Sequence, residues 1–80
     1  MIDLYKVYGH CATWTIRVDK DGFYTVAGKR FGDLCSAHRA IRIAEHRYLE
    51  AHPNAPVVNG DIWADHGLLW VEDIDGNYYN

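Results

Sequence analysis

Hydrophobic and polar side chains alternate strictly along residues 13–18. The apolar positions are Trp14, Ile16 and Val18, and the polar positions between them are Thr13, Thr15 and Arg17. A period of two is typical of a strand that buries one face. The turn sequence Asp19-Lys20-Asp21-Gly22 follows, and a three-residue loop with a glycine bulge aligns Val18 with Tyr24 and Ile16 with Val26. The pattern therefore predicts a β-hairpin with its apolar side chains on one face.

The segment between Asp33 and Pro53 has the period of an amphipathic helix. Asp33 suits the N-cap, and Pro53 ends the helix because the residue before a proline disfavours helical geometry. The predicted buried arc consists of Leu34, Ala37, Ala40, Ile41, Ala44, Tyr48 and Ala51. The opposite face is centred on Arg39, Arg42 and His46, with Ile43 as an exposed apolar residue among them.

Strand-forming residues also occupy both ends of the chain. Ile2–Tyr8 is predicted to be a first strand, and a second hairpin is predicted from Asp61–Ala64 and Leu69–Asp73, with Trp63 opposite Trp70 and Ile62 opposite Val71. Asp75-Gly76-Asn77 is a further turn signal. The prediction is one α+β domain over residues 1–80. It has a small antiparallel sheet in the order hairpin, helix, hairpin, with an added N-terminal strand and one amphipathic helix packed on one face.

Composition narrows the class of protein. Three Trp, six Tyr and two Phe in 80 residues supply a core without metal or disulfide support. Two cysteines are not the framework of a secreted mini-protein, and the first residues lack the pattern of a signal peptide. The longest apolar run, residues 68–71, is far below the roughly 20 residues of a membrane span. We therefore expect a cytoplasmic protein that does not enter membranes.

The cysteines and histidines raise two possible functions, metal binding and thiol chemistry. Cys35 and His38 are one helical turn apart, and with His10 and Cys11 they make up a conceivable Cys₂His₂ zinc set, but no C-x₂-C pair anchors it. Cys35 near a helix N-terminus is the one hint of a reactive thiol. The alternative, which we favour, is a half-buried Cys11 and a His38 at the rim of the helix. We predict no enzyme activity, no metal and no cofactor.

Arg39, Arg42 and His46 form a basic stripe on the exposed helix face, which Arg17, Lys29 and Arg30 would extend. Such a stripe indicates an alternative function, that of a small nucleic-acid-associated factor. Glu45 and Glu50 flank it, and the sequence pI is about 5.9, whereas phosphate recognition usually comes with a clearly basic domain. A solvated helix face is therefore the preferred interpretation, and direct binding of nucleic acid is not expected.

Charge is distributed unevenly along the chain. Residues 1–47 carry all eight Lys and Arg against five acids, whereas residues 48–80 carry six acids and no Lys or Arg. Carboxylates and indoles near the C-terminus are the candidate partner-binding residues: Asp61, Trp63, Asp65, Trp70, Glu72, Asp73 and Asp75. Aromatic anchors ringed by charges are typical of protein-binding patches, although the indoles can instead pack within the fold. The sequence thus predicts a monomer or homodimer that binds a protein with a basic surface.

The stretch TWTIRVDKDGFYTVAGKRFGDLCSAHRAIRIAEHRYLEAHP, followed by DIWADHGLLWVEDIDGNYY, resembles small anti-CRISPR proteins encoded by bacteriophages, the inhibitors of type I systems. This resemblance implies a non-enzymatic inhibitor acting in the cytoplasm of an infected bacterium. It would bind a Cas subunit of the surveillance complex (Cascade) and block target DNA from its basic channel. The acidic, aromatic end would then act as a DNA mimic in evading this host defence.

Overall fold

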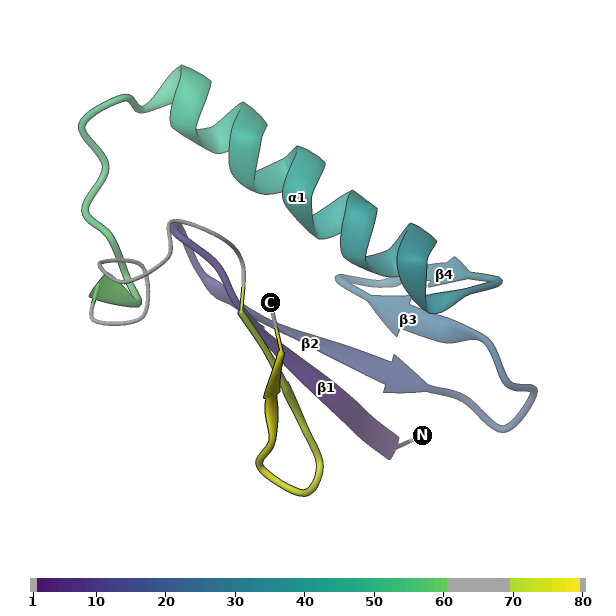
Figure 1. Ribbon diagram of the computed structural model, residues 1–80. Coiled ribbons are helices and arrows are strands. Elements are labelled where there is room, and N and C mark those ends of the chain that lie inside the picture. Colours follow the sequence, from purple (N-terminus) through teal and green to yellow (C-terminus); the bar gives the residue numbers. More distant parts are fainter. Residues whose placement is uncertain (1, 61–69, 80) are drawn as a thin grey trace.

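The computed structural model describes residues 2–60 and 70–79, and these form one antiparallel sheet with one helix across a face (Figure 1). The elements are β1 (Ile2–Tyr8), β2 (Thr13–Val18), β3 (Tyr24–Val26), β4 (Lys29–Phe31), α1 (Leu34–Ala51), β5 (Trp70–Asp73) and β6 (Tyr78–Tyr79). The predicted small α+β fold, with a helix on one face of an antiparallel sheet, is confirmed. The predicted N-terminal strand is β1.

The six strands lie in the order β4-β3-β2-β1-β5-β6. The chain builds one half of the sheet as a meander from β1 to β4, and α1 then crosses the sheet. β5 adds to the free edge of β1, so that Val7 of β1 lies opposite Val71 of β5. The N-terminal strand is therefore an interior strand, with neighbours from both ends of the chain.

The first predicted hairpin is confirmed in its register. Val18 pairs with Tyr24, and Gly22 has a φ of +84° in the turn. The carboxylate of Asp19 accepts hydrogen bonds from the backbone amides of Asp21 and Phe23, both at about 3 Å, which fixes the loop. Local turn chemistry and the alternation of β2 thus specify the same pairing.

Strand β4 was not predicted. After Val26 the chain turns through Ala27 (φ +51°) and Gly28 (φ +80°), and Val26 pairs with Lys29 across this turn. Two successive positive φ angles are the signature of a type I′ hairpin turn, which prefers Asn-Gly or Gly-Gly. Because Ala is unusual at the first of these positions, Ala27-Gly28 is not a strong turn signal.

Helix α1 begins and ends as predicted. Asp33 caps the N-terminus by accepting a hydrogen bond from the Ser36 amide at 2.7 Å, and His52 is the C-cap, directly before Pro53. The amide of His52 donates to the Tyr48 carbonyl at 2.8 Å and closes the last turn.

The predicted buried arc of α1 is partly wrong. Ala37 and Ile41 are buried, but Tyr48 is 46% exposed and Ala51 is also exposed. Glu45, which was predicted to flank the polar face, is only 4% exposed instead. The buried arc of α1 includes Glu45 because its carboxylate has hydrogen-bond donors within the fold. It excludes Tyr48 and Ala51 because the C-terminal turns of α1 lie beyond the strands (Figure 1).

The second predicted hairpin is also corrected. Val71 pairs with Val7 on one side and with Tyr79 on the other, so both of its edges are occupied and Ile62 is not its partner. Asp61–Ala64 and the proposed Trp63–Trp70 pair lie outside the described residues. The hairpin actually observed joins β5 to β6 through the predicted turn at Gly76, whose φ is +85°.

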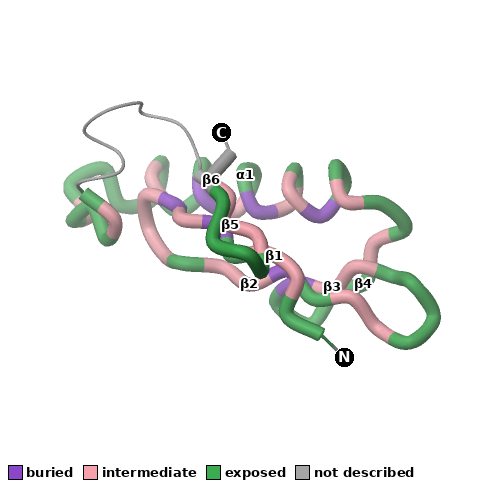
Figure 2. The backbone as a smooth tube through the Cα atoms, turned by 60° about the horizontal axis from the view of Figure 1, so that its bottom comes forward, coloured by how far each residue is buried: buried purple, intermediate pink, exposed green. Residues whose placement is uncertain are grey.

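The core lies between the sheet and α1. Its fully buried members are Val7, Ile16, Val26, Ala37 and Ile41. The buried positions face one another across the two layers, whereas the outer side of α1 is more exposed (Figure 2). Within residues 2–60 and 70–79, no helix combines the length and apolar character needed to cross a lipid bilayer.

Candidate functional site

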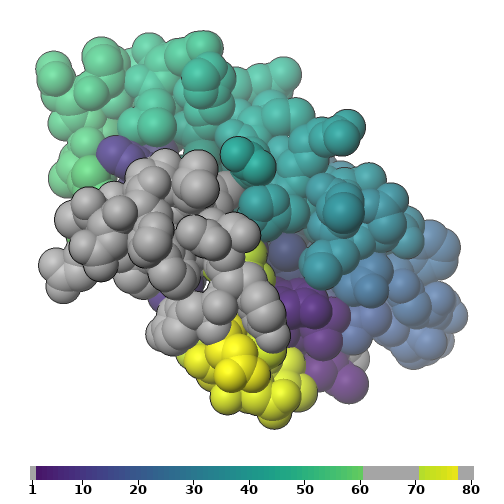
Figure 3. All heavy atoms as spheres, in the orientation of Figure 1, coloured from purple at the N-terminus to yellow at the C-terminus, as the bar shows by residue number. Residues whose placement is uncertain are grey.

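A groove of about 1050 Å³ lies between α1 and the strands β1, β2 and β5. Its floor is formed by Tyr5, Ile16, Leu34 and Val71, and its rim by Arg39, Arg42, Ile43, His46, Arg47 and Glu50 of α1. We call this set of residues the helix groove. In the space-filling view α1 forms a ridge, with β1 and the β5–β6 hairpin below it (Figure 3).

The alternation of side chains along the strands determines which residues form the floor of the groove. Val7 and Ile16 are buried towards α1, and the neighbouring Tyr5 and Val71 are packed against the same core while remaining partly exposed. Six strands spaced by about 4.8 Å span about 24 Å, whereas one helix is only about 10–12 Å wide. Among the described elements, the single helix therefore leaves part of the sheet beside it uncovered.

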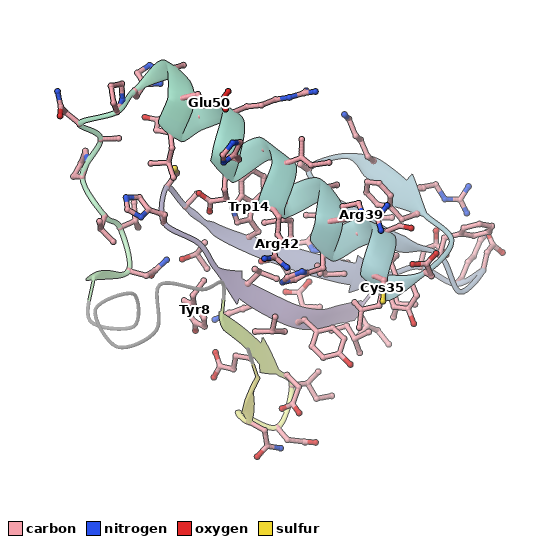
Figure 4. All side chains as sticks on the ribbon, turned by 45° about the horizontal axis from the view of Figure 1, so that its top comes forward. Tyr8, Trp14, Cys35, Arg39, Arg42 and Glu50 are labelled. Carbon is pink, nitrogen blue, oxygen red and sulfur yellow. The ribbon has the colours of Figure 1, made fainter. Side chains whose placement is uncertain are left out.

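Three arginines of α1 line the groove. Cys35, Arg39 and Arg42 follow one another along α1 (Figure 4), and Arg47 lies further towards the C-terminus. Among the described residues no carboxylate forms an ion pair with Arg39, Arg42 or Arg47, in contrast to Arg17 and Arg30. Arg39 and Arg42 are about one turn apart on one side of the helix, whereas Arg47 is about 140° from Arg42 around the helix axis.

Two histidines modify this rim. His38 is partly buried, and desolvation, with Arg42 as a second cause, lowers its pKa below the ordinary value of 6.5. His46 Nε2 lies 2.9 Å from Glu50 Oε1, one turn along the helix. Glu50 is thus held by His46, which leaves the three arginines as the dominant charges at neutral pH.

Glu45 anchors the helix over the sheet. Its carboxylate accepts hydrogen bonds from the Trp14 indole at 2.9 Å and from the Cys11 amide at 2.7 Å (Figure 4). A Cβ built on Gly9 would lie 1.5 Å from Glu45 Oε1, so glycine is required at that point. Because Glu45 and Arg42 belong to the same helix, this anchor determines the orientation of the arginines relative to the sheet.

The segment after α1 is fastened to the same β1–β2 loop. The Val58 amide donates to the His10 carbonyl at 2.9 Å, and Asn59 Nδ2 donates to the Gly9 carbonyl at 2.8 Å. These contacts connect the chain beyond the helix to the anchor around Glu45.

The two cysteines differ in environment. Cys35 is exposed and lines the helix groove, whereas Cys11 is half-buried, as predicted. Burial, together with a hydrogen bond and the charge of Glu45, raises the pKa of the Cys11 thiol to about 11. In the part of the chain that the structure describes, no group of three or more His, Cys, Asp or Glu side chains is arranged to hold a metal ion.

Of the acidic residues predicted as partner-binding, the structure describes Glu72, Asp73 and Asp75. Asp61, Trp63 and Asp65 lie outside the described residues. Glu72 accepts a 2.5 Å hydrogen bond from the Tyr8 hydroxyl, and Asp73 accepts hydrogen bonds from the amides of Asp75 and Asn77 within its own turn. Glu72 and Asp73 are adjacent in β5 and so point to opposite faces of the sheet.

The other two described residues of the predicted patch belong to the same hairpin. Trp70 is opposite Tyr8 in the register of β5 and β1, and Asp75 is exposed in the turn before β6. The Asp75 amide donates to Asp73, and a Cβ built on Gly76 would lie 4.0 Å from Glu72 Oε2, so the three described acids lie around one turn.

The basic residues predicted as the alternative site are brought together. Arg39, Arg42 and His46 are all exposed and all line the helix groove. Arg47 and the sheet residues of the floor were not predicted as site residues. Arg47 follows His46 directly, and extending the basic stripe by one residue would have included it. The floor depends on long-range strand pairing, for which the sequence held no signal.

No protein-family model, no curated protein and no solved structure matches this chain.

Proposed function

We propose that the protein is a non-enzymatic binding protein that holds an anionic partner in the helix groove. The supporting observation is that Arg39, Arg42 and Arg47 line a groove with an apolar floor. None of the three arginines forms an ion pair with a described carboxylate. A guanidinium group presents a planar fork of donors that matches carboxylate and phosphate oxygens. Apolar surface beside it reduces solvent screening and strengthens such contacts.

The test is a titration of the full chain with polyglutamate, followed by two-dimensional NMR of the backbone amides at low salt. We expect the largest shift changes at the rim residues of α1. Reversing two charges in Arg39→Glu/Arg42→Glu should weaken binding by at least about tenfold, equivalent to about 1.4 kcal/mol. Raising the salt from about 50 to about 200 mM should weaken it as well, since the Debye length shortens.

A matched control carries the same change in net charge elsewhere. Lys20 and Lys29 are exposed and lie outside the helix groove, so Lys20→Glu/Lys29→Glu should change the affinity by no more than about twofold. Equal losses in both double variants would mean that net charge, and not the groove, governs binding. The proposal would then be wrong.

The inhibitor of a type I surveillance complex remains a prediction. Its acidic residues that are described, Glu72, Asp73 and Asp75, give less support than the groove because the first two have partners within the fold. Both hypotheses share a non-enzymatic protein that works by binding. They differ in the charge of the partner, which the titration with polyglutamate addresses.

A further inference from the structure

We infer that the occupant of the helix groove is an acidic, amphipathic helix of a partner protein. This inference rests on the proposed function and deepens it by naming the class of partner. It follows from three features of the groove: its apolar floor, its arginines and its position beside α1, which is the one described helix on a six-stranded sheet.

The floor selects for an apolar face. Tyr5 and Val71 offer partly exposed hydrophobic surface from two strands, with the buried Ile16 behind them, and Ile43, 45% exposed, adds an apolar side chain on the rim. A phosphate backbone makes no use of such a floor, whereas the leucines and isoleucines of an amphipathic helix do. The floor therefore favours a protein segment over a nucleic acid.

The rim arginines select for carboxylates on the partner. Arg39 and Arg42, about one turn apart on α1, are the pair that one neighbouring helix can face, because Arg47 lies about 140° from Arg42 around the helix axis. Glu or Asp at successive turns of that helix would face this pair. The protein's own net charge of −3 opposes the approach of a long polyanion such as duplex DNA but matters less for a short peptide.

The dimensions favour a helix over an extended strand. Packed helices lie 8–10 Å apart, roughly two strand spacings, so a second helix beside α1 would cover the floor at β1 and β5. The α1 helix of a second copy of this chain is not a favourable occupant of the groove, because the arginines of the two helices would then face each other.

The experiment measures the binding of labelled peptides to the full chain by fluorescence anisotropy. The first peptide, of about 18 residues, has Leu at helical spacing and Glu on the flanks. The second has the same composition in a scrambled order without an apolar face. Duplex DNA of about 20 base pairs is the third probe. We expect the amphipathic peptide to bind at least about tenfold more tightly than the scrambled one.

Two variants test the groove itself. Ile43→Asp should weaken binding of the amphipathic peptide by at least about fivefold, since it places a carboxylate among the contacts of the apolar face. Its control is Ile74→Asp, at a 65% exposed position in the β5–β6 turn outside the groove, which should change the affinity by no more than about twofold. Both positions are exposed, so neither substitution should unfold the domain.

The outcomes separate this inference from the proposed function. If DNA or the scrambled peptide binds as tightly as the amphipathic peptide, and Arg39→Glu/Arg42→Glu still weakens binding, the anionic groove stands and the helical partner is overturned. Equal effects of Ile43→Asp and Ile74→Asp would also overturn it. If no probe binds at low salt, the proposed function fails together with the inference. Sedimentation of the chain alone reports any self-association.

Discussion

At the residue scale, the buried carboxylate of Glu45 organises this small fold. An isolated buried charge is unfavourable, but Glu45 accepts hydrogen bonds from an indole and a backbone amide. Those donors come from β2 and from the β1–β2 loop, so one side chain ties the helix to two other segments. The sequence pattern could not indicate this, because a glutamate among polar helix residues is normally exposed.

Gly9→Ala tests that anchor. The new methyl group would overlap Glu45 Oε1 and also lie 2.9 Å from the Ala12 carbonyl oxygen. We expect the free energy of unfolding to fall by about 1–3 kcal/mol, as measured by urea denaturation. Gly32→Ala is the control, since a Cβ there meets nothing within 4 Å. Similar urea midpoints for the two variants would contradict the close packing at Gly9.

At the element scale, the sequence determined most of what is local. The register of β2 and β3, the caps of α1 and the turn at Gly76 were all predicted, because turn residues and periodicity act over a few neighbouring positions. The pairing of β5 with β1 was not predicted, since it joins residues far apart in the chain. For the same reason Arg39 and Arg42 of the rim were predicted from the sequence, but the floor beneath them was not.

The turn between β3 and β4 offers a test at this scale. Ala27 has a φ of +51°, a region that costs ordinary L-residues about 1–2 kcal/mol but that Asn tolerates better. Ala27→Asn should therefore raise the free energy of unfolding by about 0.5–1 kcal/mol in urea denaturation. Gly28→Ala, at a φ of +80°, should have the opposite effect. A loss of stability in Ala27→Asn would count against the type I′ turn.

At the scale of the whole molecule, stability should fall in two stages as the pH is lowered. The folded pKa of His38 is below 6.5, so the unfolded chain takes up a proton first and stability is lost as the pH falls from about 6.5. Hydrogen bonds from the amide and hydroxyl of Ser36 lower the pKa of Asp33, so its contribution is lost below about 4. Urea midpoints measured from pH 7 to pH 3, in ~1-unit steps, should record both stages.

His38→Gln is the variant that assigns the first stage. It removes the titrating ring while keeping a polar side chain at the rim of α1, so the decline beginning near pH 6.5 should disappear and the one below about pH 4 should remain. An unchanged first decline would assign it to another histidine.

The position of β1 within the sheet has a consequence for how the protein is made. Strand β1 needs a neighbour that the ribosome releases much later: Tyr8 and Glu72, hydrogen-bonded across β1 and β5, are 64 positions apart. Until β5 is made, one edge of β1 has open amides and carbonyls, which are prone to pair with other chains. We therefore expect nascent chains that end before β5 to aggregate through that edge more readily than the full chain.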